Sequence, residues 1–498
     1  MKFALCILCL VVSSATALGA RHPDVVMIAI DDLRPMLGCY GNPHIKTPNI
    51  DRLAKHGVVF ENAYCQYAKC GPSRLSLMTG LRPATTGQYG HSTKILEEFR
   101  TSKPDAVSMA RWFKDHGYQT RSLGKIDHDT WQIAEDWSEP PFPGRDKEML
   151  EIHDEANPNG PTIIADRWEC PVLQNPDVPD NHFFAGRMTK EALHIYRERD
   201  ARPLFLAIGY RRPHLPFVAP KKYYDLYQPD ESWLAKNQDP PANAPSLAWF
   251  NSWHRRKSAV RDGAVIPQDP AELSQADWMA WNGYELRSYL GVPPQELLQP
   301  ALQVELLHAY AACVSYIDAQ IGKMLKAIDL DNTIVVLWSD HGWHLGEHSA
   351  WAKVTNFEIA TRVPFIVVAP GIPPARTSVP TELVDLYPSL CELAGLNAPK
   401  HLEGESFVAL MTDPTSTRDR VALSEIDRHL LGFHGYAMRT SRYRIVQWRD
   451  NKTGEVTALE LYDHQNDPNE TRNIAQQADL APLVAQLTER LESEFNLP

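Results

Sequence analysis

The stretch that decides the fold is residues 24–32, DVVMIAIDD. It is an apolar run that closes on two adjacent aspartates. Continuous rather than alternating hydrophobicity is typical of a strand covered on both faces, as in a parallel sheet. Residues 204–210, LFLAIGY, and 333–339, TIVVLWS, show the same pattern and also end in charged or polar residues. We expect strands in these three segments, and a fourth at residues 364–369.

Helical patterns lie between the expected strands. Thr47 and Pro48 supply an N-cap and a first-turn proline for a helix over residues 49–56, which ends at a glycine. Further helices are expected within residues 305–330, 382–394 and 480–495. Alternating strands and helices predict an α/β fold with a large, mostly parallel sheet flanked by helices.

The chain of 498 residues changes character along its length. Residues 1–20 have a basic start, an apolar run and a small-residue cleavage site, which is typical of a secretory signal peptide. Residues 21–402 are expected to form a catalytic domain. Within it, residues 227–300 are rich in Pro, Asn, Gln and Trp, and we expect a long surface excursion that either shapes a cleft or is a plain insertion.

From about residue 403 the pattern becomes that of short strands, at residues 436–439, 443–448 and 459–462. Residues 403–498 are therefore expected to form a smaller C-terminal subdomain with an antiparallel sheet.

Composition restricts the partners. The formal net charge is −12, which argues against nucleic-acid binding. It leaves an anionic small substrate open, because local positive charge can dominate a cleft. The apolar start is too short to span a bilayer and no later apolar run reaches about 18 residues, so no stable membrane insertion is expected. A signal peptide implies a secreted or periplasmic protein, or a lysosomal one in a eukaryote.

Six cysteines remain after removal of a signal peptide: Cys39, Cys65, Cys70, Cys170, Cys313 and Cys391. None forms a CxxC pair, so a zinc cluster is not expected. A disulfide or two would be compatible with secretion, with the pairing open.

Acidic pairs follow two of the expected strands, Asp31-Asp32 and Asp340-His341. Ligands of open parallel sheets bind beyond the carboxyl ends of the strands. Two neighbouring carboxylates repel each other, and a divalent cation relieves that repulsion. Oxygen ligands favour Ca²⁺ or Mg²⁺, although a histidine is an unusual ligand for calcium. The alternative for either pair is a turn or helix-cap role.

Residues 70–74, CGPSR, lead into residues 75–80, LSLMTG. A cysteine before a turn is ordinary, but the longer run resembles the modification motif of the formylglycine-dependent sulfatases of the alkaline phosphatase superfamily. Residues 117–125, GYQTRSLGK, resemble the second signature of that family.

Within the family, the chain looks most like the iduronate-2-sulfatase-like enzymes. The segments that carry this resemblance are residues 31–41, 209–217, 339–348, 351–353 and 460–468. The similarity runs, with gaps, from about residue 24 to the C-terminal region. It implies an alkaline phosphatase-like fold.

The resemblance also implies roles for individual residues. One Ca²⁺ per chain would be held by Asp31, Asp32, Asp340, His341 and Cys70, the last as formylglycine. Arg74 would fix and polarise the formylglycine, and Lys125, His128, His214 and Lys353 would surround the sulfate. One hydroxyl of the hydrated aldehyde would attack sulfur, and His214 or Lys353 would protonate the departing alkoxide. His128 would then act as the base that releases sulfate from the sulfo-enzyme intermediate.

Two positions depart from the family pattern, Lys69 just before the nucleophile and Asp127 beside His128. Other candidates have simpler interpretations. Lys125 could be a surface lysine, and His128 and His214 could be structural. His344 and His348 are expected to be structural, and Trp112, Trp338 and Trp343 to be packing residues.

The sequence thus predicts hydrolysis of sulfate esters on sulfated saccharides, with 2-O-sulfated uronic acid residues of a polysaccharide favoured by the subgroup. It also predicts a second partner, the formylglycine-generating or sulfatase-maturing enzyme that would oxidise Cys70. The alternatives are a phosphonate monoester or phosphodiester hydrolase of the same superfamily, and an inactive carbohydrate-binding relative.

Overall fold

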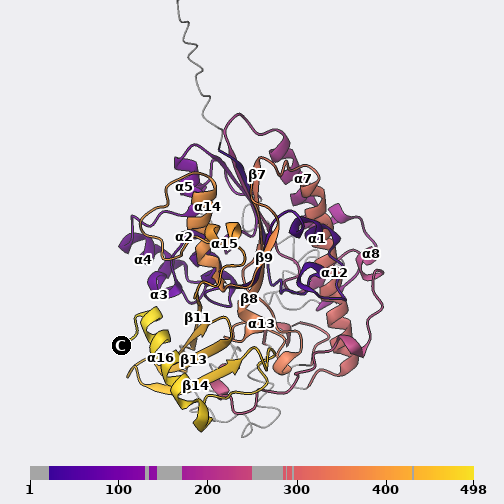
Figure 1. Ribbon diagram of the computed structural model, residues 1–498. Helices are drawn as coiled ribbons and strands as arrows, with labels where there is room; N and C mark the ends of the chain where they lie inside the picture. Colours follow the sequence, from indigo (N-terminus) through magenta and orange to yellow (C-terminus); the bar gives the residue numbers. More distant parts are fainter. Residues whose placement is uncertain are drawn as a thin grey trace, which may run out of the picture.

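The computed structural model describes residues 22–128, 134–142, 171–249, 284–287, 289–293, 297–428 and 431–498 (Figure 1). The predicted signal peptide, Cys170 and much of the excursion at 227–300 lie outside these ranges. In the described part, the main sheet has the order β10-β2-β8-β7-β1-β5-β3, and β9 pairs with β2.

Four parallel strands lie next to one another at one end of this sheet, in the order β7-β1-β5-β3. They are β1 (Asp24–Ile30), β3 (Gln119–Gly124), β5 (Leu204–Tyr210) and β7 (Thr333–Ser339). β1 lies between β5 and β7, with Ile30 in register with Tyr210 and Ser339. Every residue of β1, β5 and β7 is buried, as the continuous apolar runs predicted. The three strands therefore end side by side, and the polar residues that follow them meet at one edge.

The other strands of the sheet are β2 (Val58–Tyr64), β8 (Arg362–Val368), β9 (Ala375–Thr377) and β10 (Thr381–Glu382). β8 is the strand predicted at residues 364–369. It runs antiparallel to both β7 and β2. The sheet is thus mostly parallel but mixed on this side.

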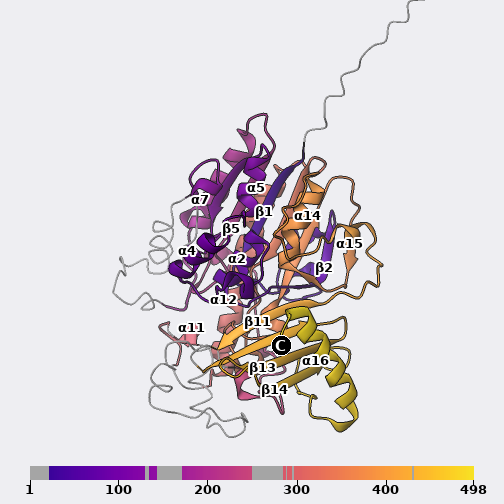
Figure 2. The same cartoon turned by 90° about the vertical axis from the view of Figure 1, so that its left-hand side faces the viewer.

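Helices cover both faces of the main sheet (Figures 1 and 2). One face carries α1 (Pro48–Ala54), α7 (Phe184–Arg197) and α12 (Pro300–Leu325), and the other carries α2 (Cys70–Thr79), α5 (Met109–Asp115), α14 (Leu386–Leu393) and α15 (Val408–Thr412). Alternate residues of β1 serve the two faces: Val26 and Ile28 belong to the core with α12, and Val25 and Met27 to the core with α14. Two buried layers account for the absence of alternation in the sequence.

Shorter elements complete the described part of this region. They are α3 (Pro83–Thr86), α4 (Thr93–Ser102), β4 (Leu173–Gln174), β6 (Phe217–Val218), α8 (Lys221–Tyr224), α11 (Tyr284–Arg287) and α13 (Glu358–Thr361). The helix expected within 305–330 begins five residues earlier, at Pro300, where a proline in the first turn costs no hydrogen bond.

The C-terminal sheet is antiparallel, in the order β11-β12-β13-β14. Its strands are β11 (Ala422–Arg428), β12 (Phe433–Arg439), β13 (Tyr443–Asp450) and β14 (Val456–Asp463), and α16 (Ala481–Phe495) packs on it. Three of these strands were predicted and β11 was not. The division at residue 402 remains a prediction.

Buried charges join the two sheets. Glu358 accepts hydrogen bonds from Arg439 at 3.1 Å and Arg444 at 2.5 Å, and Tyr64 of β2 donates to it at 2.8 Å. Arg444 also donates to Glu470 at 2.8 Å. Glu358, His464 and Glu470 could in principle hold a metal ion, but the two arginines already balance these carboxylates.

In the described part of the chain, Cys39, Cys65, Cys70, Cys313 and Cys391 are all free thiols. No described helix is both long and apolar enough to cross a bilayer.

Candidate active site

The predicted site residues converge at the carboxyl edge of the central strands. Asp31 and Asp32 follow β1, Asp340 and His341 follow β7, and His214 lies in the loop after β5. Cys70 is the first residue of α2, a helix that is buried along its whole length. Segments more than 300 residues apart in the sequence thus meet around one thiol.

Four side chains offer metal-ligand atoms that all lie within 4.8 Å of one another: Asp31, Cys70, Asp340 and His341. Asp32 belongs to an overlapping group with Asp31, Cys70 and His214. The Oδ2 atom of Asp32 is buried and accepts no hydrogen bond from the described residues. A buried carboxylate oxygen without a donor is costly, and a hard cation would satisfy it. These donors therefore fit the predicted Ca²⁺.

The orientation of His341 also suits a ligand. Its Nδ1 atom lies 2.9 Å from the carbonyl oxygen of Gly342, which can only accept, so Nδ1 carries the proton. The lone pair of Nε2 then faces the centre of the site, 3.3 Å from Cys70 Sγ. A backbone carbonyl that fixes the tautomer is usual behind a metal-binding histidine.

Arg74 of α2 connects the carboxylates that follow β1 and β7. Its Nε donates to Asp340 Oδ2 at 2.8 Å and its Nη2 to Asp31 Oδ1 at 3.2 Å. Its Nη1 donates to the carbonyl oxygens of Lys125 and Ile126. The side chain is completely buried. Arg74 is one turn of α2 beyond Cys70, so these bonds also fix the start of that helix.

Two lysines reach the same centre. Lys125 Nζ lies 2.5 Å from Asp31 Oδ2, and Lys353 Nζ lies 2.7 Å from Asp32 Oδ1 and 3.4 Å from Cys70 Sγ. Burial would lower the pKa of each ammonium group, but the carboxylates outweigh it and raise both pKa values above normal. Both lysines are therefore cations that can bind an anion at Cys70.

His128 lies beside these cations and stacks on His91, with ring centroids 3.8 Å apart. Burial, together with Lys125, holds the pKa of His128 well below its usual range. The ring is therefore neutral near pH 7 and can accept a proton.

His214 approaches the carboxylates from the loop after β5. Its Nδ1 is 2.7 Å from the carbonyl oxygen of Leu215, and its Nε2 is 3.1 Å from Glu285 Oε1 and 4.0 Å from Asp32 Oδ2. Glu285 also lies 3.6 Å from Lys353. Sequence reasoning missed both Glu285 and His91. Glu285 belongs to α11, within the weakly periodic excursion at residues 227–300, so no local sequence pattern indicated its role. Its position beside His214 and Lys353 favours the interpretation that the excursion shapes the cleft.

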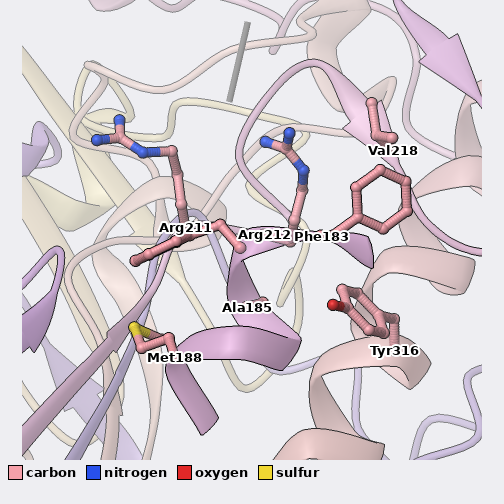
Figure 3. Close-up of a pocket in the computed structure, with 8 residues that line it drawn as sticks. Phe183, Ala185, Met188, Arg211, Arg212, Val218 and Tyr316 are labelled. Atoms are coloured by element: carbon pink, nitrogen blue, oxygen red, sulfur yellow. The ribbon is translucent and has the colours of Figure 1, made fainter. Parts of the chain in front are cut away.

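Arg211 and Arg212 complete the positive surroundings. Figure 3 shows their guanidinium groups above a small cavity that Met188 and Tyr316 also line. Arg211 acts electrostatically on Lys125 and His128. Arg212 donates to the carbonyl oxygen of His214 at 3.1 Å and so supports that loop.

The remaining candidates have structural surroundings. His344 is buried and bonded to Thr355 at 2.9 Å, and His348 packs on Phe357. Trp338 and Trp343 are buried. Trp112 donates to the carbonyl oxygen of Asn397 at 3.1 Å.

Burial, reinforced by Asp136, raises the pKa of Asp127 to about 7. Its carboxyl group is therefore largely protonated in mildly acidic solution and does not repel an anion bound in the site. Burial lowers the pKa of Lys69 to about 8.

The raised pKa of Asp127 predicts a pH-dependent stability. The pKa in the unfolded chain is near 4, so the unfolded chain releases the proton first and stability falls between about pH 4 and pH 7. Asp127→Asn removes this loss. We expect the variant to be about 4 kcal/mol more stable than the wild type at pH 8, because one pKa unit corresponds to about 1.4 kcal/mol, and only about 1 kcal/mol more stable at pH 4.5. Denaturant titrations at both pH values measure this, and an equal difference at the two would contradict it.

Comparisons with known proteins agree with this geometry. The family model described as Sulfatase matches residues 23–396, and the model described as N-sulphoglucosamine sulphohydrolase, C-terminal, matches residues 346–496. Iduronate 2-sulfatase of Homo sapiens is 30% identical over 546 residues, which covers 93% of this chain and 93% of that protein.

Solved structures agree with the predicted alkaline phosphatase-like fold. The phosphonate monoester hydrolase of Agrobacterium radiobacter matches with a TM-score of 0.70 at 20% identity, over 95% of each chain. A 2-O GAG sulfatase matches with a TM-score of 0.66 at 21% identity, over 96% of this chain and 92% of that one. At these identities the structural likeness shows the fold alone.

Proposed function

The chain belongs to the sulfatase family and is a sulfuric ester hydrolase, and from that premise we propose that it desulfates saccharides with Cys70 as its nucleophile after oxidation to formylglycine. The observation that carries the proposal is the position of Cys70. Its sulfur lies 3.3 Å from His341 and 3.4 Å from Lys353, within a buried group of carboxylates and cations.

The environment of Cys70 disfavours the unmodified thiol as nucleophile. Burial raises the pKa of this thiol, so it stays protonated at neutral pH and reacts poorly. Formylglycine would supply a hydrated aldehyde, with one hydroxyl to attack sulfur and a second whose proton is removed when sulfate is released. A formylglycine-generating or sulfatase-maturing enzyme is then a required partner.

The residues that would hold Ca²⁺ are Asp31, Asp32, Asp340 and His341, together with residue 70. When bound, the ion would stabilise negative charge on the sulfuryl oxygens and on the attacking oxygen. Arg74 holds the carboxylates of Asp31 and Asp340 in position through hydrogen bonds from its guanidinium group.

The other groups act on the substrate directly. Lys125 and Lys353 bind the sulfate oxygens and stabilise the charge that grows on them. His214, or Lys353 beside it, gives a proton to the departing sugar oxygen. His128, whose ring is neutral, takes the proton from the second hydroxyl.

The similarity over most of the chain to human iduronate 2-sulfatase supports a saccharide substrate. We favour 2-O-sulfated uronic acid residues of a polysaccharide. The predicted signal peptide would place the reaction outside the cytoplasm, in a secreted or periplasmic protein, or in a lysosomal one in a eukaryote.

A phosphonate monoester hydrolase is the second candidate, because such an enzyme shares the fold. The test compares kcat/KM for 4-nitrophenyl sulfate and 4-nitrophenyl phenylphosphonate, and then measures sulfate release from a panel of defined sulfated saccharides. We expect the aryl sulfate to be preferred and 2-O-sulfated uronic acids to be desulfated. A preference for the phosphonate would favour the second candidate.

Mass spectrometry of the peptide that spans Cys70, from protein made in its native host, tests the oxidation. A retained thiol together with inactivity on the whole panel would favour the third candidate, an inactive carbohydrate-binding relative.

A further inference from the structure

Glu285 lies beside both of the groups that could give a proton to the departing sugar oxygen. Its Oε1 atom is 3.1 Å from His214 Nε2, and its Oε2 atom is 3.6 Å from Lys353 Nζ. Burial would raise the pKa of Glu285, but Lys353 and His214 outweigh it and hold the pKa below its usual range. The carboxylate is therefore ionised at neutral pH and attracts both groups.

A negative charge at this position does not help to bind a sulfate ester. Lys353 would bind the sulfate oxygens, and Glu285 balances part of its positive charge. Asp32, the other carboxylate near His214, at 4.0 Å, is one of the proposed metal ligands. Glu285 belongs to none of the groups that could hold a metal ion in the described part of the chain. Its contribution to the reaction must therefore differ from binding the sulfate or the metal.

The packing of the short helix α11 fixes the position of Glu285 (Figure 2). The next residue, Leu286, is completely buried in the core that includes α12, and Tyr289 belongs to the same core. The guanidinium group of Arg287 donates to the carbonyl oxygen of Pro293 at 2.6 Å. The backbone that follows Glu285 is therefore anchored, which limits where its side chain can reach.

A backbone connection joins the segment of Glu285 to the loop of His214. The amide of Val172 donates to the carbonyl oxygen of Leu290 at 3.2 Å, and its own carbonyl oxygen accepts from the amide of Phe217 at 2.8 Å. Leu290 lies five residues after Glu285, and Phe217 lies three residues after His214. Short stretches of anchored backbone therefore hold the carboxylate and the imidazole ring next to each other.

Contacts at both ring nitrogens fix the orientation of His214. Its Nδ1 atom lies 2.7 Å from the carbonyl oxygen of Leu215, and its Nε2 atom faces Glu285. Both partners can only accept, so each favours a proton on the nitrogen that it faces. Lys353, which Glu285 also contacts, lies 3.4 Å from Cys70 Sγ. Glu285 therefore directs the Nε2 proton toward the side of the site where the reacting group lies.

We propose that Glu285 is a positioning residue, which holds His214 as the proton donor to the departing oxygen of the sulfate ester. The inference rests on the proposed function and deepens it by selecting His214 over Lys353, whose nearer carboxylate is Asp32 at 2.7 Å. When the bond between sulfur and the sugar oxygen breaks, its electron pair stays on that oxygen and the Nε2 proton moves to it. The ring takes a proton back from water before the next turnover, and Glu285 keeps its charge throughout.

The experiment varies how much the leaving group needs a proton. 4-Nitrophenolate is a stable anion that can leave without one, phenolate is less stable, and a sugar alkoxide needs a proton most. The substrates are 4-nitrophenyl sulfate, phenyl sulfate and the saccharide of the panel that the wild type desulfates fastest.

The variants are Glu285→Gln, Glu285→Ala, His214→Ala and the double variant of the last two. Glu492→Gln is the matched control. Glu492 is also a partly exposed carboxylate in an ion pair, with Arg449 at 2.6 Å, but it belongs to α16 of the C-terminal region. Thermal melts check that each variant is folded.

We expect Glu285→Ala to lower kcat about a hundredfold for the saccharide, less for phenyl sulfate and least for 4-nitrophenyl sulfate. KM should not rise, because a charge that repels sulfate has been removed. Glu285→Gln can still accept a hydrogen bond and should lose less. In the His214→Ala background, Glu285→Ala should cost little more, since the ring that it positions is gone. Glu492→Gln should keep wild-type kinetics on all three substrates.

Three results would overturn the proposal. Equal losses of kcat on the saccharide and on 4-nitrophenyl sulfate would indicate a purely structural role for Glu285. Losses that add up in the double variant would show that Glu285 acts independently of His214. A lower KM with unchanged kcat on every substrate would show that the carboxylate only repels the anion. A wild type that is inactive on the aryl sulfates and on the whole saccharide panel would overturn the proposed function instead.

Discussion

Replacing Cys70 with alanine should abolish sulfate ester hydrolysis and leave the fold intact. The side chain is the point at which the carboxylates, both lysines and His341 converge, and alanine offers no atom that can attack sulfur. Loss of a nucleophile of this kind costs on the order of a million-fold in kcat. Initial rates with 4-nitrophenyl sulfate measure the loss, and thermal melts check the fold.

Two further variants sharpen this test. Cys391→Ala removes a buried thiol of α14 that does not belong to the group around Cys70, and it should keep wild-type rates. Cys70→Ser would present a single hydroxyl, which could take up one sulfuryl group but has no second hydroxyl from which to release it. We expect at most one turnover and a stably sulfated protein, visible by mass spectrometry. Wild-type turnover by Cys70→Ala would rule out Cys70 as the nucleophile.

The centre of the fold could be predicted because its physical cause is local. β1, β5 and β7 are buried on both faces, so their sequences are apolar without interruption, and each ends where polar residues begin. The direction of β8 could not be predicted in this way. β8 is also an apolar run, but it lies antiparallel to its neighbours β7 and β2. The direction of a strand depends on the path of the connecting chain, which the apolar pattern does not reveal.

β11 was missed for a related reason. Its sequence, ALSEIDR, places Glu425 and Asp427 among apolar residues, a pattern that resembles a surface segment. In the structure Glu425 is buried and bonded to His434 at 2.8 Å. A partner on another strand satisfies the charge, and that partner is invisible in the local sequence.

The site also combines residues that local sequence patterns mark with residues that only the tertiary structure brings in. Cys70 and Arg74 stand in a recognisable run, and the acidic pairs stand at recognisable strand ends. Glu285 and His91 have no such mark, because they reach the site through tertiary structure alone. Residues that touch a site from irregular segments are the ones that sequence patterns miss.

Arg74→Lys should lower both activity and stability, although the charge is kept. The arginine joins Asp340 and Asp31 by separate nitrogens and donates to two carbonyl oxygens with the third. A lysine presents one compact ammonium group and cannot hold both carboxylates in this geometry. At least one fully buried carboxylate would lose its partner, which costs about 3 kcal/mol or more of folding free energy.

The activity of Arg74→Lys should fall about a hundredfold or more, since displaced carboxylates no longer hold the reacting group in position. Arg82→Lys is the matched control. Arg82 makes a two-pronged contact with Glu382, both bonds 2.6 Å, but it is partly exposed and remote from Cys70. It should lose little stability and no activity. Denaturant titrations and kcat separate the two effects, because a purely structural Arg74 would lower stability while the folded fraction kept its wild-type kcat. That result would remove Arg74 from the positioning of the site.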